Sequence, residues 1–298
     1  MINYWMISIP KSKYEIFIKN KDKQIEFTNK YQKRVKRIEI DDRMIIYIKD
    51  IKKWILNYCK SMSNEAKSLV VGVSGGIDSS VVSTLCAMTG KKTFVVSMPI
   101  QQNKEQYNLS LKHQEWLKNN YKNIETFVIP LDNIFKDFQI ALSNFNSLHG
   151  FANSRARLRM ATLYQIAQSN NGLVVGTGNK VEDFGVGFYT KYGDGGVDLS
   201  PIADLTKSEI FTLGKQLNII EAIQTAAPTD GLWNDNRTDE DQIGATYPEL
   251  EWAMDFSLEE NALSEREKEV LKIYRHLRKV NLHKMKEIPV CNIPEELK

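Results

Sequence analysis

Cysteine is scarce in this 298-residue chain, which has only Cys59, Cys86 and Cys291, far apart in the sequence. No two of them stand at the short spacing that a structural zinc site or a redox pair requires. An odd and sparse cysteine count also argues against a disulfide framework and is typical of a protein in a reducing compartment. We therefore expect a cytoplasmic protein.

Long apolar runs are also lacking. No stretch reaches the roughly 18 apolar residues that indicate a membrane span. The N-terminus, MINYWMISIPKSKYEIFIKNK, does not have the basic segment followed by an apolar core that marks a secretory signal. The composition, 42% hydrophobic and 26% charged, is ordinary for a globular protein with one large domain and an appendage.

Neither sign of charge dominates, since the net charge is +3, but the first 50 residues are more basic than the rest. They hold 12 Lys and Arg against 7 Asp and Glu, whereas the remaining residues hold 28 against 30. A basic head of this kind could contact an anion such as nucleic acid. Because its charges are mixed in sign, a solvated surface is the simpler interpretation.

The hydrophobic pattern divides the chain in two. Residues 1–48 contain short β-branched and aromatic runs between polar breaks, among them YWMISIP, YEIFIKN and RMIIYI, and predict a small β-rich extension. The period then changes, because IKDIKKWILNYCKSM places its apolar residues at helical spacing. Residues 49–298 are therefore predicted to form the second, larger domain.

Strands and helices alternate along this larger domain. Apolar strands are predicted at 68–73, 93–99, 124–131 and 172–178, with helices between them, one of them at 154–170. Uniformly apolar strands separated by helices predict an α/β fold with a doubly wound, mostly parallel sheet. Ligands of such sheets bind beyond the carboxyl ends of the strands, so the residues after VVGV and LVVG should share one cleft.

The strand at 68–73 leads into the loop SGGIDSS, residues 74–80, and then into a helix. Gly75 and Gly76 permit a tight turn, and the free N–H groups at the start of the helix make an anion site. Asp78 would repel a bare phosphate, but it suits a Mg²⁺ ion held between its carboxylate and phosphate oxygens. The alternative is a glycine turn in which Asp78 only helps to cap the helix.

The loop lacks the G-x-x-x-x-G-K-[ST] pattern, whose lysine reaches the β- and γ-phosphates in Walker-type proteins. Kinase- or motor-type transfer of the γ-phosphate is therefore disfavoured. SGGIDSS instead resembles the pyrophosphate loop of the N-type ATP pyrophosphatases. That resemblance implies a Rossmann-like fold and cleavage of ATP between its α- and β-phosphates, with adenylation of an oxygen.

A second distinctive stretch, GTGNKVEDFGVGFYTKYGDGGVDLSPIADLTKSEI, covers residues 176–210 and has five glycines between 185 and 196. Such glycine density indicates a loop shaped around a ligand. With NSRARLRMATLY before it and APTDGLW after it, this stretch resembles the ammonia-dependent NAD synthetases, and the likeness covers about residues 50–298. The stretch from Glu182 to Lys191 is one residue longer than in the short bacterial forms.

Lys207 stands out on physical grounds alone. TKSE, residues 206–209, reads as a capping box that starts a helix at Thr206. A lysine in the first turn opposes the helix dipole by about 0.3–1 kcal/mol, whereas an anionic ligand there would reverse the sign. The pattern therefore favours a functional Lys207.

The resemblance implies a role for each matching position. ATP would be bound by Gly72, Val73, Ser74, Gly75, Gly76, Ile77, Asp78, Ser79, Thr177, Lys207 and Thr229. Deamido-NAD would be bound by Arg157, Lys191, Asp198, His283 and Lys284. Asp198, at the nicotinate end, and Lys207 would be the catalytic residues, and Asp78 with Glu182 would hold Mg²⁺.

The implied reaction is a two-step ligation. The nicotinate carboxylate attacks the α-phosphate of ATP, and ammonia then attacks the acyl-adenylate to give NAD⁺ and AMP. Ammonia is the expected nitrogen source, because the roughly 48 residues that precede the synthetase-like region contain no cysteine for an amidase. The resemblance also implies a homodimer, with residues 50–62 and 154–170 as candidate interface helices.

Two alternatives remain. The same ATP chemistry could act on another acceptor such as a tRNA base, although lone cysteines argue against thiolation. The first 45 or so residues faintly resemble the opening of a PUA-like or EVE-type module, so residues 1–48 could bind nucleic acid.

Several other polar residues favour ordinary roles. In SRARLRM, Arg155 and Arg159 share one helix face and Arg157 points elsewhere. TDED, residues 238–241, is predicted to be a solvated helix start rather than part of a lid formed with Arg237. His113, His149 and His276 are expected to be surface histidines.

Overall fold

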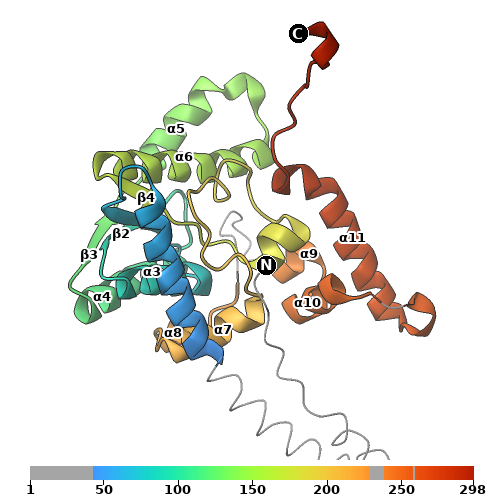
Figure 1. Cartoon of the computed structure of the whole chain (residues 1–298), viewed down its shortest axis with the longest axis horizontal. Coiled ribbons are helices and arrows are strands. Elements are labelled where there is room, and N and C mark those ends of the chain that lie inside the picture. The colour runs from blue at the N-terminus through green and yellow to red at the C-terminus, as the bar shows by residue number, and fades with distance from the viewer. Residues whose placement is uncertain (1–42, 229–237, 258) are drawn as a thin grey trace, which may run out of the picture. The chain divides into compact units, whose positions relative to one another are not determined.

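The computed structural model describes residues 43–228, 238–257 and 259–298, and Tyr47–Lys298 form one compact unit (Figure 1). Most of the predicted β-rich extension lies outside the described residues. Its last segment, RMIIYI, is wrong as a strand, because a helix runs over 43–61. Met44, Ile55 and Cys59 are fully buried, and their spacing belongs to the helical pattern that was predicted to start only later.

Four parallel strands form the sheet. They are β1 (Ser68–Gly72), β2 (Lys92–Ser97), β3 (Ile124–Val128) and β4 (Gly172–Val174), in the order β3-β2-β1-β4. The register pairs Val70 with Phe94 in β2 and with Val174 in β4. The predicted parallel sheet and all four of its strands are confirmed, although each strand ends before the apolar run does.

Helices account for most of the remaining described chain. Their bounds are α3 Ile77–Met88, α4 Lys104–Asn120, α5 Asp132–Ala141, α6 Leu148–Ser169, α7 Lys207–Gln216, α8 Glu221–Gln224, α9 Asp239–Ile243, α10 Tyr247–Asp255 and α11 Glu265–Met285, with a π-helix, η2, at Lys180–Val186. Helix α6 begins six residues before the predicted helix because the Ser147 side chain caps it at the Gly150 N–H. Within the described ranges, no helix is both long and apolar enough to cross a membrane.

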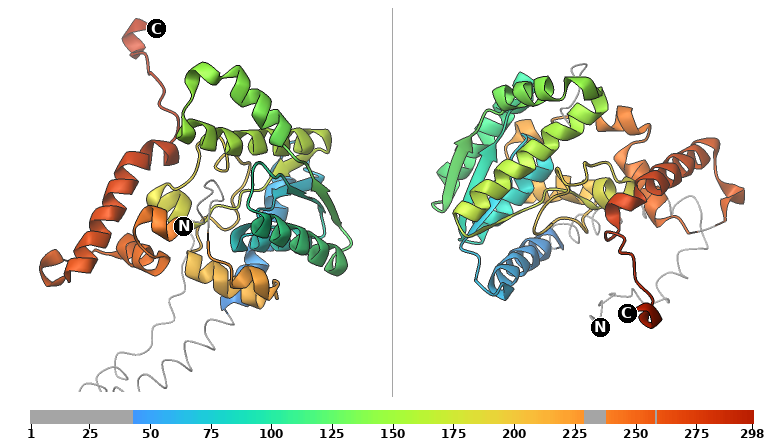
Figure 2. Two further views of the ribbon diagram at one scale, coloured as in Figure 1. Left: turned by 180° about the vertical axis from the view of Figure 1, so that it is seen from behind. Right: turned by 90° about the horizontal axis from the view of Figure 1, so that it is seen from above.

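Alternate strand residues pack against different layers of helices. Val70, Phe94 and Val96 lie in a core with Phe135 of α5 and Ala167 of α6. Val95 instead packs with Ala87 of α3 and Leu117 of α4. Figures 1 and 2 show α5 and α6 together on one side of the strands. The doubly wound α/β architecture is therefore confirmed.

A separate hydrophobic cluster joins the π-helix η2 to α9, α10 and α11, which lie to one side of the sheet (Figures 1 and 2). Val181 and Val186 of η2 are fully buried there, against Leu250 of α10 and Leu271 of α11. This packing fixes η2, which carries Glu182, relative to α10.

The strand order sets where a ligand can bind. The chain passes outward from β1 to β2 and β3, and then crosses back to add β4 on the other side of β1. The direction in which strands are added therefore reverses between β1 and β4, which makes the carboxyl ends of these two strands the switch point where doubly wound folds bind ligands.

Candidate active site

Hydrogen bonds from its own serines fix the conformation of the loop after β1. The Ser74 N–H donates to Ser79 Oγ at 3.3 Å, the Gly76 N–H donates to Ser74 Oγ at 3.2 Å, and Ser79 Oγ donates to the Gly76 carbonyl at 3.1 Å. Gly76 is the N-cap of α3, and no side chain caps that end of the helix. The first N–H groups of α3 are therefore available to an anion.

A cleft of about 720 Å³ opens at the carboxyl ends of β1 and β4. The predicted site residues that line it are Gly72, Val73, Ser74, Gly75, Gly76, Ile77, Asp78, Ser79, Arg157, Thr177, Glu182, Lys191, Lys207, His283 and Lys284. The expectation that the residues after VVGV and LVVG share a cleft is confirmed. Thr229 lies outside the described residues.

Lys207 joins the two predicted metal-binding carboxylates. Its Nζ lies 2.7 Å from Asp78 Oδ2 and 2.8 Å from Glu182 Oε1, and only 3% of its side chain is exposed. The predicted capping box is present, since Thr206 accepts from the Glu209 N–H and Glu209 accepts from the Thr206 N–H. Lys207 therefore enters the site from the first turn of α7, as the sequence indicates.

The electrostatics of this trio favour an additional cation. Burial by itself would lower the pKa of Lys207, but Asp78 and Glu182 outweigh it and hold the pKa above its ordinary value. Burial also acts to raise the pKa of Glu182, but the nearby Lys207 ammonium outweighs burial, so the pKa of Glu182 is lowered. The pKa of Asp78 stays raised by burial despite Lys207. The single ammonium of Lys207 thus pairs with two largely buried carboxylates.

Two residues without a predicted role, Asn179 and Tyr247, hold this trio in place. The Asn179 side chain accepts from the N–H groups of Val181 and Glu182 at the start of η2, and its Nδ2 donates to Asp78 Oδ1 at 3.1 Å. Tyr247 Oη donates to Glu182 Oε1 at 2.5 Å. Asn179 follows β4, so its place beyond a strand end was a usable signal. Tyr247 lies 65 residues from Glu182, and no local pattern connects them.

Four of the five residues predicted to bind the dinucleotide line the cleft and lie close to one another. Arg157 Nε donates to the Lys191 carbonyl at 3.4 Å, and Lys191 Nζ donates to the His283 carbonyl at 3.0 Å. Lys284 Nζ donates to the Tyr189 carbonyl at 2.7 Å. The structure therefore brings together a loop, α6 and α11, which are far apart in sequence.

Of the three arginines of α6, Arg157 and Arg159 line the cleft, whereas Arg155 is buried beside the Phe135 ring. Arg159, which is not among the predicted site residues, donates from Nε to the Met98 carbonyl at 3.0 Å. Burial, together with Arg155, lowers the pKa of Arg159 to about 10, so the side chain remains cationic at neutral pH. The sequence predicts Arg155 and Arg159 on one helix face, and that spacing does not show that only Arg159 of this pair lines the cleft.

Asp198 does not line the cleft or the smaller cavity described below. Its Oδ1 accepts from Tyr164 Oη at 3.1 Å and its Oδ2 accepts from the Val174 N–H at 2.7 Å. Both carboxylate oxygens are therefore used to tie the glycine-rich loop to the end of β4. In this structure Asp198 is placed to position the loop, and its predicted catalytic role gains no support. Asp194, four residues earlier, does line the cleft.

Two further expectations are wrong, one in part and one in full. A helix does start at Thr238 and Asp241 is exposed, as predicted, but Asp239 is not solvated. Asp239, at the start of α9, is only 6% exposed and lines the cleft, because Tyr247 packs over the first turn that was taken to be solvated. His113 is fully buried, not on the surface, and its Nε2 lies 2.8 Å from Ser83 Oγ. Burial lowers the pKa of His113 to about 4, so this imidazole is neutral under ordinary conditions.

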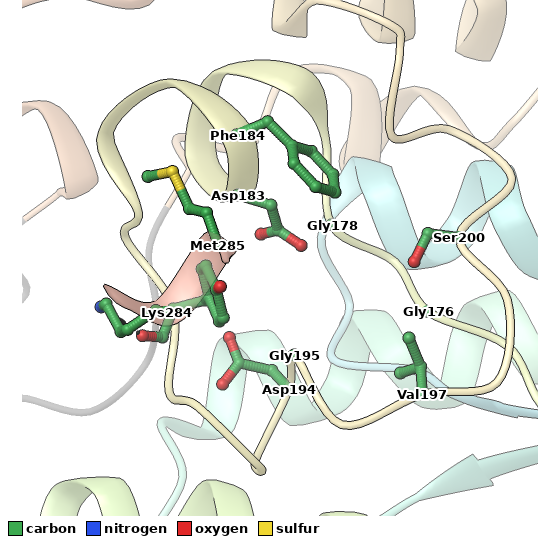
Figure 3. A pocket seen from close by; sticks show the side chains of 11 residues that line it. Gly176, Gly178, Asp183, Phe184, Asp194, Gly195, Val197, Ser200, Lys284 and Met285 are labelled. Carbon is green, nitrogen blue, oxygen red and sulfur yellow. Dashed lines mark hydrogen bonds between the residues drawn. The ribbon is translucent and has the colours of Figure 1, made fainter. Parts of the chain in front are cut away.

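A smaller cavity of about 190 Å³ adjoins the cleft and shares several of its residues. The carboxylates of Asp183 and Asp194 point toward its interior, as Figure 3 shows. A side chain on Gly178 would begin 1.8 Å from Asp183 Oδ2, so only glycine leaves room for this carboxylate. Burial first, and then Asp194, hold the pKa of Asp183 well above its ordinary value, which a cation in the cavity would reverse.

Comparison with known proteins is consistent with this site. Residues 47–288 match the family model described as NAD synthase. An NH3-dependent NAD⁺ synthetase of Carboxydothermus hydrogenoformans is 37% identical over 204 residues, which cover 66% of this chain and 81% of that protein. That of Mesoplasma florum is 34% identical over 241 residues, 78% of this chain and 94% of that protein.

Two solved structures are also similar to this chain. An NMN synthetase from Francisella tularensis superposes with a TM-score of 0.75 at 33% identity, over 84% of this chain and 99% of that one. An NH3-dependent NAD synthetase from Campylobacter jejuni gives a TM-score of 0.66 at 28% identity, with the same two shares. This chain belongs to the NAD synthase family.

Proposed function

We propose that this protein catalyses the ATP-dependent amidation of deamido-NAD by ammonia, giving NAD⁺, AMP and pyrophosphate. The observation that carries the proposal is the meeting of Asp78, Glu182 and Lys207 beside a loop with free N–H groups. The lysine and the N–H groups suit a polyphosphate that leaves with added negative charge, and the two acids suit a cation bound together with it. Family membership supports the same reaction.

In the first step, a nicotinate carboxylate oxygen attacks the α-phosphorus of ATP. The bond from that phosphorus to the α,β-bridging oxygen breaks, and pyrophosphate takes the electron pair. The N–H groups at the start of α3 and the Lys207 ammonium would stabilise the departing charge, since both are fixed before the reaction. The carboxyl carbon is then part of a mixed anhydride, which amines attack far more readily than a carboxylate.

The residues present fit a Mg²⁺ ion. Asp78 and Glu182 supply the carboxylate oxygens that Mg²⁺ prefers, and both lie close enough to share the Lys207 ammonium. Within the described residues, no group of three or more side chains forms a metal site, so substrate phosphate oxygens would complete the coordination. When bound, Mg²⁺ would neutralise phosphate charge as pyrophosphate leaves.

In the second step, ammonia attacks the activated carbonyl carbon and AMP leaves. We place the supply of ammonia at the smaller cavity, where Asp183 and Asp194 favour the ammonium cation from which ammonia derives. Lys284 also lines this cavity, and its Nζ already lies 5.0 Å from the Tyr189 ring centroid, so the attraction for ammonium rests on the two carboxylates. The expected proton acceptor would be one of these carboxylates.

Other expectations remain proposals. Arg157, Lys191, His283 and Lys284 would bind deamido-NAD, and Asp198 would position the glycine-rich loop rather than touch the reacting atoms. A cytoplasmic homodimer, paired through the helix at 50–62 and the α6 segment 154–170, stays a prediction. Modification of a tRNA base is disfavoured by family membership, and nucleic-acid binding through residues 1–48 stays a prediction.

The assay combines purified protein with ATP, Mg²⁺, ammonium and deamido-NAD, and follows NAD⁺ and AMP. We expect the two products in equal amounts and no NAD⁺ when glutamine replaces ammonium. A parallel reaction contains nicotinate mononucleotide, because a structural relative is an NMN synthetase. Faster amidation of the mononucleotide would move the proposal to that substrate, and no AMP with either substrate would refute it.

Replacing Asp183 by asparagine is expected to raise the ammonium concentration for half-maximal rate about tenfold, the effect of about 1.4 kcal/mol. The amide keeps the shape of the carboxylate beside Gly178 but loses the charge that attracts ammonium. The matched control is Asp204→Asn, since the side chain of Asp204 is 87% exposed. An unchanged ammonium dependence in Asp183→Asn would remove the smaller cavity from the proposal.

A further inference from the structure

Tyr247 is buried where the start of α10 meets the candidate active site. Only 4% of the residue is exposed, and Thr246 and Glu249 form a capping box that fixes the start of the helix. The Tyr247 N–H donates to Glu240 Oε1 at 2.8 Å, which ties the start of α10 to α9. The backbone of Tyr247 is therefore anchored before its side chain makes any contact.

The phenol group fixes one oxygen of Glu182. Tyr247 Oη donates to Glu182 Oε1 at 2.5 Å, and the same oxygen accepts from Lys207 Nζ at 2.8 Å. Two donors on one oxygen set the rotation of the carboxylate. A cation bound by Glu182 would then be met by the other carboxylate oxygen, Oε2.

The ring of Tyr247 acts on the other member of the trio. Lys207 Nζ lies 4.8 Å from the ring centroid, a cation–π distance. Two of the three protons of this ammonium are used by Asp78 and Glu182. The aromatic face limits where the third proton can point.

Asp239 supplies a second possible acceptor for the phenol. Its Oδ2 lies 3.2 Å from Tyr247 Oη, and its N–H donates to the Pro228 carbonyl at 3.1 Å. A phenol has a single proton to donate, and the shorter distance assigns it to Glu182. The hydroxyl proton of Tyr247 is therefore assigned to Glu182, and Asp239 Oδ2 is the more distant of its two possible acceptors.

We propose that Tyr247 is a positioning residue for the adenylation step. Its hydroxyl orients Glu182 for the cation, and its ring holds the Lys207 ammonium toward the phosphates. This role rests on the proposed function, because the orientation of Glu182 matters only if Glu182 binds a cation during adenylation. Tyr247 itself does not contact the reacting atoms.

The test is Tyr247→Phe, which keeps the ring and removes the hydroxyl. We expect kcat about 10- to 100-fold lower and weaker divalent-cation binding, as is typical when a residue supporting a metal ligand is lost. The KM for deamido-NAD should stay within about twofold of the unaltered protein, since the residues that would bind it lie elsewhere in the cleft. Binding is measured without turnover, as Mn²⁺ bound in the presence of α,β-methylene-ATP by electron paramagnetic resonance.

Two further variants separate structure from positioning. Tyr121→Phe removes a hydroxyl at the end of α4, outside both cavities, and should change neither kcat nor Mn²⁺ binding. Tyr247→Leu also removes the ring, and should lower kcat further than Tyr247→Phe by releasing Lys207. Thermal unfolding of each variant identifies any loss that is due to misfolding.

The outcomes distinguish the two proposals. Absence of amidation by the unaltered protein would overturn the proposed function, whatever the variants do. An active protein whose Tyr247→Phe variant keeps its kcat and its Mn²⁺ affinity would overturn the role of Tyr247 alone. If that variant unfolds, the Mn²⁺ affinity of folded Tyr247→Leu decides, because it too lacks the hydroxyl.

Discussion

Lys207→Met is expected to lower kcat by about 10²- to 10³-fold, the usual effect of removing one fixed group that stabilises charge in the transition state. Methionine is close to lysine in length and apolar, so the packing under α7 is kept while the ammonium is lost. Its loss also leaves Asp78 and Glu182 without the partner that they share. Breaking a buried ion pair from one side costs about 3–5 kcal/mol of unfolding free energy. NAD⁺ formation and urea unfolding measure the two effects.

The pH dependence of this variant has a definite sign. Without Lys207, the pKa values of Asp78 and Glu182 in the folded protein rise, because burial is no longer opposed by the ammonium. Unfolded carboxyls have pKa values of about 4, so above that pH the folded variant binds more protons than the unfolded chain. The stability lost relative to the unaltered protein should therefore grow as the pH rises from about 4 toward 7.

Added Mg²⁺ should return part of this stability, since a divalent cation can take the place of the ammonium between the two carboxylates. The control is Lys92→Met, because Lys92 pairs with Glu125 at an exposed position on the strands. A Lys207→Met variant with unchanged stability at pH 7 would contradict the ion-pair arrangement. Unchanged kcat would contradict its role in the reaction.

The sheet was the most predictable part of the fold. Four apolar runs separated by helices indicate parallel pairing, because strands covered by helices on both faces are apolar throughout. The central strands β1 and β2 are buried in this way, whereas the edge strand β3 is partly exposed. The ends of the strands were less predictable. Strand β4 stops at Val174, and Val175 instead forms an isolated bridge with Leu199. A partner 24 residues away leaves no mark on the local pattern, so the apolar run read as a longer strand.

The helix at 43–61 shows how two signals can compete. The run RMIIYI is rich in β-branched residues and reads locally as a strand. Over a longer window, the buried residues Met44, Ile55 and Cys59 follow helical spacing, and burial of that face determines the structure. Local propensity is a weaker signal than the period that the core imposes.

The residues of the candidate site also differ in how far the sequence could predict them. Residues within a motif, such as Asp78 and Lys207, could be found because the loop and the capping box constrain them locally. Tyr247 and Asp239 could not, since their roles depend on α9 and α10 packing beside η2. Asp198 and Asp194 lie four residues apart in one irregular loop. Only its turns decide which carboxylate bonds to β4 and which lines the cleft.

Gly75→Ala is expected to destabilise the protein by about 2–5 kcal/mol and to weaken ATP binding, for two separate reasons. Gly75 has φ +94°, a conformation that costs an L side chain energy wherever it occurs. A Cβ atom there would also lie 2.4 Å from the Gln106 carbonyl of α4. Because that contact is with helix backbone, no side-chain rotation relieves it, and the loop must move. Urea unfolding and the KM for ATP measure the result.

Substitutions at two other glycines, Gly90 and Gly76, distinguish the conformational cost from the steric overlap. Gly90→Ala introduces a side chain at φ +78° with no atom within 4 Å, so it carries the conformational cost without the overlap and should leave activity intact. Gly76→Ala has ordinary φ, and its nearest atom is Ser74 Oγ at 3.4 Å, so its stability should change least. If Gly75→Ala lost no more stability than Gly90→Ala, the close approach of α4 to the loop would be wrong. The phosphate loop would then owe its shape to its own serines and not to the helix behind it.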